Sequence, residues 1–328
     1  MNSRAIEEQA QAGQQRLTVK RLREWESLRY GMFIHFGMST FDRDELSEGN
    51  QPSTCYCPDQ LDVEQWVSVA RDAGMKYAVL TAKHVSGHCL WPSEYTDYHV
   101  GTSGNPVDVV DAFVTACEKR GLMAGLYYCS WDNHHPFGSL TPSMTDWDLA
   151  YTTAAYQQFQ SRQIEELLTR YGPVGEVWID IPKVLPRGYR HDLYDEIAAL
   201  NPDAVVMMNC GLGDAFDYPV ATAWPSDLVA MERSLPDSTR GHVRWRTIEG
   251  NDYYLPGEVS DTIGKCWFYR DSDRLRSDAE LLGMYLTTAS RHASLLLDVP
   301  PDCHGRLPSA TVGSLMRLRR NVEGCGCL

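Results

Sequence analysis

The stretch GEVWIDIP, residues 175 to 182, places a carboxylate at the end of an otherwise apolar run. With the period of a β-strand, Val177 and Ile179 share one face, while Trp178 and Asp180 share the other. A buried parallel strand is normally apolar on both faces, so the face with Asp180 must look into a space that tolerates charge. The mouth of a parallel barrel, at the C-terminal ends of its strands, is such a space. The alternative is a solvated or capping aspartate at a strand-to-loop junction.

Polar and aromatic side chains also occur at the ends of three other predicted strands. A stable fold does not by itself require so many reactive side chains at these positions. Because the C-terminal ends of parallel strands meet at one rim, these side chains are expected to share a pocket. The residues are His35 in the first strand, Lys83 and His84 in the second, Tyr127, Tyr128 and Trp131 in or after the third, and Trp178 and Asp180 in the fourth.

Aromatic rings beside histidines and carboxylates suit a sugar, whose C–H faces stack on rings while its hydroxyls take hydrogen bonds. Hydrolysis of a glycoside needs two carboxyl groups, one ionised to attack and one protonated to assist the leaving oxygen. Asp180 is the candidate nucleophile. Three later residues, Glu232, Glu249 and Glu258, compete for the role of the acid.

Strand-like and helix-like segments alternate along most of the chain, and about eight such units predict an α/β fold of the (β/α)₈ TIM-barrel type. A doubly wound sheet is the runner-up, but no G-x-G-x-x-G follows the first strand and no phosphate-binding loop occurs. The expected domains are an N-terminal extension at 1–24, the barrel at 25–322 and a tail at 323–328. The expected strands cover 30–37, 76–84, 122–130, 175–181, 204–210, 219–225, 251–259 and 294–301.

The charge balance argues for a small neutral substrate. The 328 residues include 30 Lys and Arg against 44 Asp and Glu, a net charge of −14, which disfavours nucleic acids and anionic membranes as partners. The polar N-terminus lacks the apolar core of a secretion signal, so we expect a cytoplasmic location. The ten cysteines are scattered, which is typical of free thiols rather than a disulfide framework or a metal site. The composition says nothing of the oligomeric state.

An ordered set of segments resembles the α-L-fucosidases of glycoside hydrolase family 29. The resemblance covers roughly residues 25–322, and each segment stands in the family's order. The segments are YGMFIHFGMSTF (30–41), AGMKYAVLTAKHVSGHCLWPS (73–93), GLYYCS (125–130), VWID (177–180), CWFY (266–269) and SLLLDVPPDCHGRLP (294–308).

This resemblance implies a TIM barrel and a retaining double-displacement mechanism that uses no metal or other cofactor, acting on terminal α-L-fucosyl residues of a small or oligosaccharide substrate. It assigns Asp180 as nucleophile and Glu232 as acid/base, with Glu258 as second choice. The family's Glu-Trp after the first strand has no clean match; Glu45 or Glu48 can serve, and TCY at 54–56 is the alternative alignment. The C-terminal β-sandwich common in the family is not expected. The substrate-binding positions it suggests are His35, Glu45, His84, Tyr128, Trp131, Trp178, Glu258 and Trp267.

The main departure is KHVSGH, where most family members read Lys-His-His-Asp-Gly-Phe. Val85 and Ser86 thus replace a histidine and an aspartate of the pocket. Such a change can shift specificity, because a buried polar group left unpaired is costly, so a related sugar such as α-L-galactose is an alternative substrate. Two other classes remain: an inactive sugar-binding barrel, and a metal-dependent hydrolase using His35, His84, His88 and Asp298.

Overall fold

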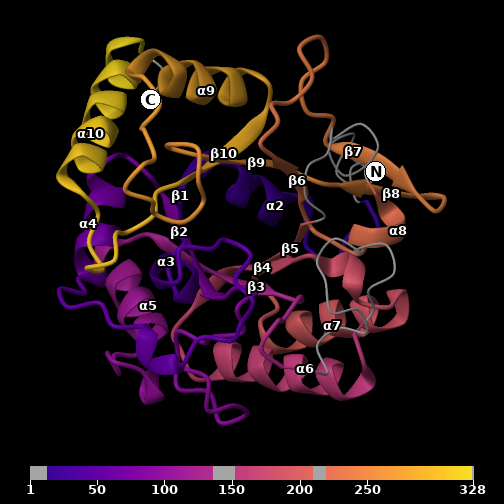
Figure 1. Ribbon diagram of the computed structural model, residues 1–328. Coiled ribbons are helices and arrows are strands. Elements are labelled where there is room, and N and C mark those ends of the chain that lie inside the picture. The colour runs from indigo at the N-terminus through magenta and orange to yellow at the C-terminus, as the bar shows by residue number, and fades with distance from the viewer. Residues whose placement is uncertain (1–12, 136–151, 210–218, 327–328) are drawn as a thin grey trace.

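Eight parallel strands form the centre of the protein, with helices packed around them (Figure 1). The computed structural model describes residues 13–135, 152–209 and 219–326. The strand order is β5-β4-β3-β2-β1-β10-β9-β6. This is the order in which neighbouring strands follow one another around a (β/α)₈ barrel. This arrangement confirms the predicted TIM-type barrel.

Most of the expected strand-helix units are present. The strands are β1 (Tyr30–Ile34), β2 (Tyr77–Lys83), β3 (Met123–Cys129), β4 (Val174–Asp180), β5 (Val205–Asn209), β6 (Val229–Glu232), β7 (Trp245–Ile248), β8 (Asn251–Tyr254), β9 (Gly257–Thr262) and β10 (Ala293–Asp298). The helices are α2 (Val19–Glu26), α3 (Met38–Phe41), α4 (Val63–Asp72), α5 (Val109–Arg120), α6 (Ala154–Thr169), α7 (Arg187–Leu200), α8 (Val220–Ala223), α9 (Asp278–Ser290) and α10 (Ser309–Gly324).

Local sequence explains where the helices around the barrel begin. The side chains of Asp62, Asp108 and Thr153 accept hydrogen bonds from the first turns of α4, α5 and α6. Ser277 forms a reciprocal capping box with Glu280 at the start of α9. These contacts satisfy amide groups that have no partner within the helix, so they define the residue at which each of these helices begins.

The sixth and seventh strands were predicted wrongly. Residues 219–225, expected as a strand, contain the short helix α8, flanked by Pro219 and Pro225. Proline cannot donate to a strand ladder, which explains why this segment does not pair. The true sixth strand is β6. The expected strand at 251–259 joins two elements, since β8 pairs with β7 in a hairpin and only β9 belongs to the barrel.

The seam between β5 and β6 is closed largely by side chains of the residues that precede β6. The Asp227 amide donates to Val206 O at 2.8 Å, and the Asp227 carboxylate accepts from the Val206 amide at 2.9 Å. The hydroxyl of Ser226 accepts from the Met208 amide at 3.1 Å. Among the described residues, β5 and β6 are the two strands at the ends of the hydrogen-bonded order, so these contacts complete the cylinder.

Helix α2 lies at the N-terminal mouth of the barrel. Its Trp25 is fully buried, and the indole Nε1 donates to Glu176 Oε2 at 3.1 Å inside the cylinder. Residues 1–12 of the expected N-terminal extension, Cys210 of the fifth strand and residues 327–328 of the tail lie outside the described residues. In the described ranges, none of the helices has the length and apolarity needed to cross a membrane.

Candidate active site

A cavity of about 400 Å³ opens at the C-terminal ends of the barrel strands. Its volume falls within the range of small-molecule sites. The cavity combines aromatic, acidic and imidazole side chains from widely separated parts of the chain, as the sequence predicted. Its lining residues are Phe33, His35, Glu45, Leu46, His84, Val85, Tyr127, Trp178, Asp180, Ile181, Lys183, Asn209, Glu232, Ser260 and Trp267.

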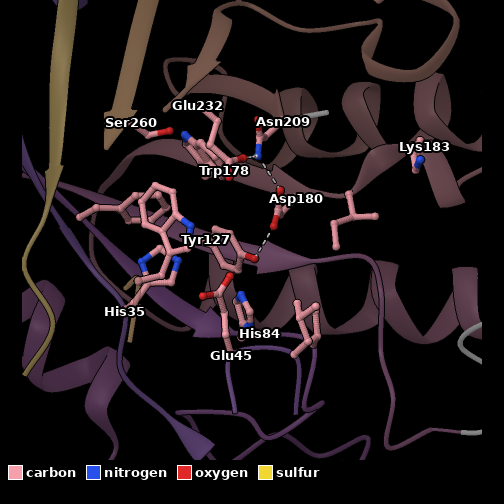
Figure 2. Close-up of a pocket in the computed structure, with 15 residues that line it drawn as sticks. His35, Glu45, His84, Tyr127, Trp178, Asp180, Lys183, Asn209, Glu232 and Ser260 are labelled. Carbon is pink, nitrogen blue, oxygen red and sulfur yellow. Dashed lines mark hydrogen bonds between the residues drawn. The ribbon is translucent and has the colours of Figure 1, made fainter. Parts of the chain in front are cut away.

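Asp180 ends β4 and points into the cavity between two hydrogen-bond donors (Figure 2). The Tyr127 hydroxyl donates to Oδ2 at 2.6 Å, and the Asn209 amide donates to Oδ1 at 2.7 Å. Burial raises the pKa of Asp180, whereas these two donors and the amide of Ile181 act in the opposite direction by stabilising the ionised form. The site thus holds the carboxylate in one orientation.

Glu232 ends β6 and lies close to Asp180. The same Asn209 nitrogen that donates to Asp180 also donates to Glu232 Oε2, at 2.9 Å. Because both bonds start from one atom, the two carboxylate oxygens are separated by at most the two bond lengths laid end to end, about 5.6 Å. Asn209 therefore sets the spacing of the two carboxyl groups.

The two carboxyl groups affect each other's ionisation. Burial raises the pKa of Glu232 to about 7, and the negative charge of Asp180 adds to this effect. Two acids this close cannot both ionise easily, because the second negative charge is repelled by the first. The Tyr127 and Asn209 donors stabilise the ionised form of Asp180.

The chain turns in the same way after each carboxyl residue. Ile181 has φ of 51° and Arg233 has φ of 49°, both in the left-handed region. This conformation is unfavourable for residues other than glycine, and especially for β-branched isoleucine, so the surrounding fold must impose it. Backbone strain of this kind concentrates at functional sites, and here it lies directly beside both carboxyl groups.

Two histidines form the opposite side of the cavity. His35 Nδ1 lies 2.8 Å from Asp298 Oδ1, while the ring of His84 stacks on Tyr127 with centroids 5.6 Å apart. Burial lowers the pKa of His35 to about 3 and raises that of Asp298 well above its usual value. Burial also lowers the pKa of His84 well below its usual value. Neutral imidazoles can both donate to and accept from hydroxyl groups.

Aromatic rings complete the wall beside His35. The Trp267 ring centroid lies 5.0 Å from that of His35 and 6.1 Å from that of Phe33, and the Trp178 ring packs edge-on against Phe33 at 5.1 Å. The Arg233 guanidinium lies over the Trp267 ring at 4.8 Å. This wall offers apolar faces of the kind on which the C–H surface of a sugar packs.

Tyr128 was predicted from the sequence as a substrate-binding residue, but the adjacent Tyr127 lines the cavity. Tyr128 points away from the cavity, where its hydroxyl accepts from Lys83 Nζ at 3.1 Å and donates to Gln163 at 2.8 Å. Successive strand residues face opposite sides of a sheet, so the adjacent Tyr127 faces the cavity instead.

Trp131 and Glu258 also lie away from the cavity. Trp131 is buried, and its indole donates to Asn133 Oδ1 at 2.5 Å within the loop after β3. Glu258 is on the inward face of β9, one layer deeper than the lining residue Ser260, and its carboxylate accepts from Tyr77 and Trp178. Neither residue lines the cavity. Of the two alternatives after the first strand, Glu45 lines the cavity and Glu48 is exposed.

Two polar residues that line the cavity, Asn209 and Ser260, were not predicted from the sequence. Asn209 pairs with Asp180 across the β4–β5 ladder, so it occupies the same level of the rim. A polar residue at the end of the apolar run AVVMMN was a detectable signal. Ser260 pairs with Glu232 across β6 and β9. Finding it required the true boundary of the sixth strand.

The histidine and aspartate set considered for a metal does not converge. His35 bonds to Asp298, while His88 stacks on Tyr56 and lies 3.0 Å from the Ser53 hydroxyl. In the parts of the chain that the structure describes, no three His, Cys, Asp or Glu side chains are grouped as metal ligands.

Known proteins resemble this chain in both sequence and fold. The family model described as Alpha-L-fucosidase matches residues 50–320. Alpha-L-fucosidase 1 of Arabidopsis thaliana is 32% identical over 298 residues, which cover 86% of this chain and 55% of the relative. The chain spans about half the length of this relative and of a similar curated relative from Oryza sativa.

Two solved structures illustrate the similarity of fold. The α-L-fucosidase isoenzyme 1 from Paenibacillus thiaminolyticus superposes with a TM-score of 0.78 at 26% identity, covering 94% of this chain and 76% of that one. The α-L-fucosidase AlfC from Lactobacillus casei, in complex with α-L-fucose product, gives a TM-score of 0.75 at 21% identity, covering 94% and 100%. From the extent of the family match and the level of identity, the chain belongs to the α-L-fucosidase family of glycoside hydrolases, family 29.

Proposed function

We propose that this protein is a retaining exo-glycosidase that removes terminal α-L-fucosyl residues. The observation that carries the proposal is the spacing of Asp180 and Glu232, whose nearest oxygens share one Asn209 nitrogen and are at most about 5.6 Å apart. Carboxyl groups about 5 to 5.5 Å apart are typical of retaining enzymes, whereas inverting enzymes need about 6.5 to 9.5 Å to admit a water molecule. Family membership supports fucose as the sugar.

In this mechanism ionised Asp180 attacks the anomeric carbon while protonated Glu232 donates a proton to the leaving oxygen. The attack forms a covalent fucosyl–Asp180 ester and breaks the glycosidic bond. Tyr127 and Asn209 orient the attacking carboxylate through the hydrogen bonds described above. Water then attacks the ester and restores the free enzyme.

The charge of Asp180 gives Glu232 both of its roles. While Asp180 is ionised, its charge helps to raise the pKa of Glu232 and keeps the acid protonated. Formation of the ester removes that charge, so the pKa of Glu232 falls and the residue is ready to accept a proton from the attacking water. One group thereby serves as acid in the first step and as base in the second.

A second substrate, an α-L-galactoside, is favoured by one feature of the cavity. Val85 lines the cavity at a position where most family members carry a histidine. An apolar side chain there removes a hydrogen-bond partner for the sugar and leaves more room than an imidazole does. The pocket thus differs from the family pattern at a point where hydroxyl recognition is expected to matter.

The test of the proposed function is a screen of nitrophenyl glycosides. We expect rapid release of nitrophenol from the α-L-fucoside, with the α-L-galactoside as the comparison and the β-L-fucoside and α-D-glucoside as stereochemical controls. Proton NMR of the first-formed sugar should show the α anomer, because two displacements restore the original configuration. The β anomer as first product contradicts the retaining mechanism, and absence of turnover on every α-L-glycoside contradicts the function.

The pH dependence of kcat/KM should follow the two carboxyl groups. The rate is expected to rise on the acidic side as Asp180 ionises and to fall as pH increases through about 7, since Glu232 then loses the proton it must donate. The measurement is kcat/KM for a fucoside with a poor leaving group from acidic to alkaline pH. The Glu232→Ala variant is the control and should lack the alkaline decline. An unchanged decline in that variant assigns the ionisation to another group.

A further inference from the structure

Two buried glutamates meet inside the barrel below the cavity, and the mechanism above uses neither. Glu176 on β4 and Glu258 on β9 are at most 1% exposed, and the charge of Glu258 acts on Glu176. Burial raises the pKa of both carboxyl groups, that of Glu258 to about 7.

The two glutamates differ in the hydrogen-bond donors around them. Glu258 Oε1 accepts from the Tyr77 hydroxyl at 2.6 Å, and its Oε2 accepts from the Trp178 indole at 2.9 Å. Glu176 accepts one bond, from Trp25 to Oε2, and its Oε1 has no conventional donor. Glu258 is thus held by more donors than Glu176. Burial and the charge of Glu258 raise the pKa of Glu176 well above its usual value.

Trp178 connects this pair to the nucleophile. Its ring lines the cavity and stacks on Tyr127, with centroids 5.6 Å apart and an interplanar angle of 23° (Figure 2). The Tyr127 hydroxyl in turn donates to Asp180 at 2.6 Å. The indole is therefore held from below by Glu258, and its face supports the ring that orients the attacking carboxylate.

We propose that Glu258 is a positioning residue that fixes the Trp178 indole, and through it Tyr127 and Asp180, in the orientation required for attack on the sugar. This inference rests on the proposed glycosidase function. A purely structural role for Glu258 predicts a loss of stability alone, whereas positioning predicts a loss of sugar binding and turnover in protein that is fully folded.

The experiment compares variants that remove different contacts of the same carboxylate. Glu258→Leu removes the acceptor of the indole and is expected to lower kcat/KM for nitrophenyl α-L-fucoside by about 10-fold, because small displacements of positioning groups are costly. The inhibition constant of L-fucose should rise with it. Glu258→Gln keeps one acceptor oxygen and should restore most of the activity. Tyr77→Phe is the matched control: it removes the other donor, so it should lower the melting temperature without changing the kinetics.

A double-mutant cycle with Trp178→Phe decides whether Glu258 acts through the indole. In the Trp178→Phe background, which lacks the N–H donor, Glu258→Leu is expected to cause little further loss. Multiplicative losses, or a Tyr77→Phe variant as slow as Glu258→Leu, overturn the inference. If Glu258→Leu does not fold, the double variant Tyr77→Phe/Glu258→Leu replaces it, because this variant removes both partners of the Tyr77–Glu258 hydrogen bond. The same results then support or overturn the inference. A wild-type protein without glycosidase activity contradicts the proposed function instead.

Discussion

Replacement of Asp180 by glycine is expected to lower kcat/KM for nitrophenyl α-L-fucoside by about 10⁴- to 10⁶-fold, the scale seen when a nucleophile is removed. The loss follows from the absence of the oxygen that attacks the anomeric carbon. Added azide should restore part of the turnover, because this small anion fits the space left by the carboxylate. The expected product is β-L-fucosyl azide, since azide attacks from the face that Asp180 occupied.

The control for this experiment is a second aspartate on a barrel strand. Asp261 on β9 does not line the cavity and pairs with Arg276 at 2.8 Å. Asp261→Asn should retain nearly full activity, while Asp180→Asn should be nearly inactive. An active Asp180→Asn variant, or azide rescue that yields the α-azide, assigns the nucleophile to a different group.

Replacement of Glu232 by alanine is expected to slow hydrolysis of natural fucosides by about 10²- to 10⁴-fold, the usual contribution of a general acid. Substrates with good leaving groups, such as dinitrophenyl fucosides, need no proton in the first step. Their cleavage should therefore lose much less, and the fucosyl–enzyme ester should accumulate because its hydrolysis has lost the base. Mass spectrometry of the intact protein after rapid quenching measures that ester.

Glu249 supplies the matched control for Glu232. It competed with Glu232 as the acid in the sequence analysis, but the structure places it on the β7–β8 hairpin turn, in an ion pair with Arg187. Glu249→Ala should therefore leave both classes of substrate unaffected. If Glu249→Ala or Glu258→Gln shows the leaving-group dependence expected of Glu232→Ala, the assignment of Glu232 is wrong.

The barrel and the position of Asp180 were predictable because they depend on local patterns. Alternation of strands and helices defines the architecture, and a carboxylate at the end of an apolar strand indicates the catalytic rim. The sixth strand was misplaced because β6 has only four residues and follows a proline-rich segment. Glu232 was still expected near the cavity, which it lines, since the family pattern places an acid in this region.

The errors within the site come from strand register, which the sequence does not report. Tyr127 and Tyr128 are chemically equivalent in the sequence, and only pairing of β3 with β4, where Tyr127 lies beside Trp178, shows which one faces inward. Glu258 shares the inward face with Ser260, but the stagger of the strands places it one layer below the cavity. Depth along a barrel depends on contacts between distant segments, so a single strand does not encode it.

The closure of the barrel between β5 and β6 bears on the stereochemistry of the reaction. Asp180 and Glu232 stand on opposite sides of this junction, and at the level of the rim the amide of Asn209 ties them together. A widening of only one or two ångströms brings the pair toward the separation at which a water molecule fits between sugar and carboxylate. In the proposed mechanism, the choice between one displacement and two therefore depends on side-chain contacts that join β5 and β6, with Asn209 at the rim and Ser226 and Asp227 below it.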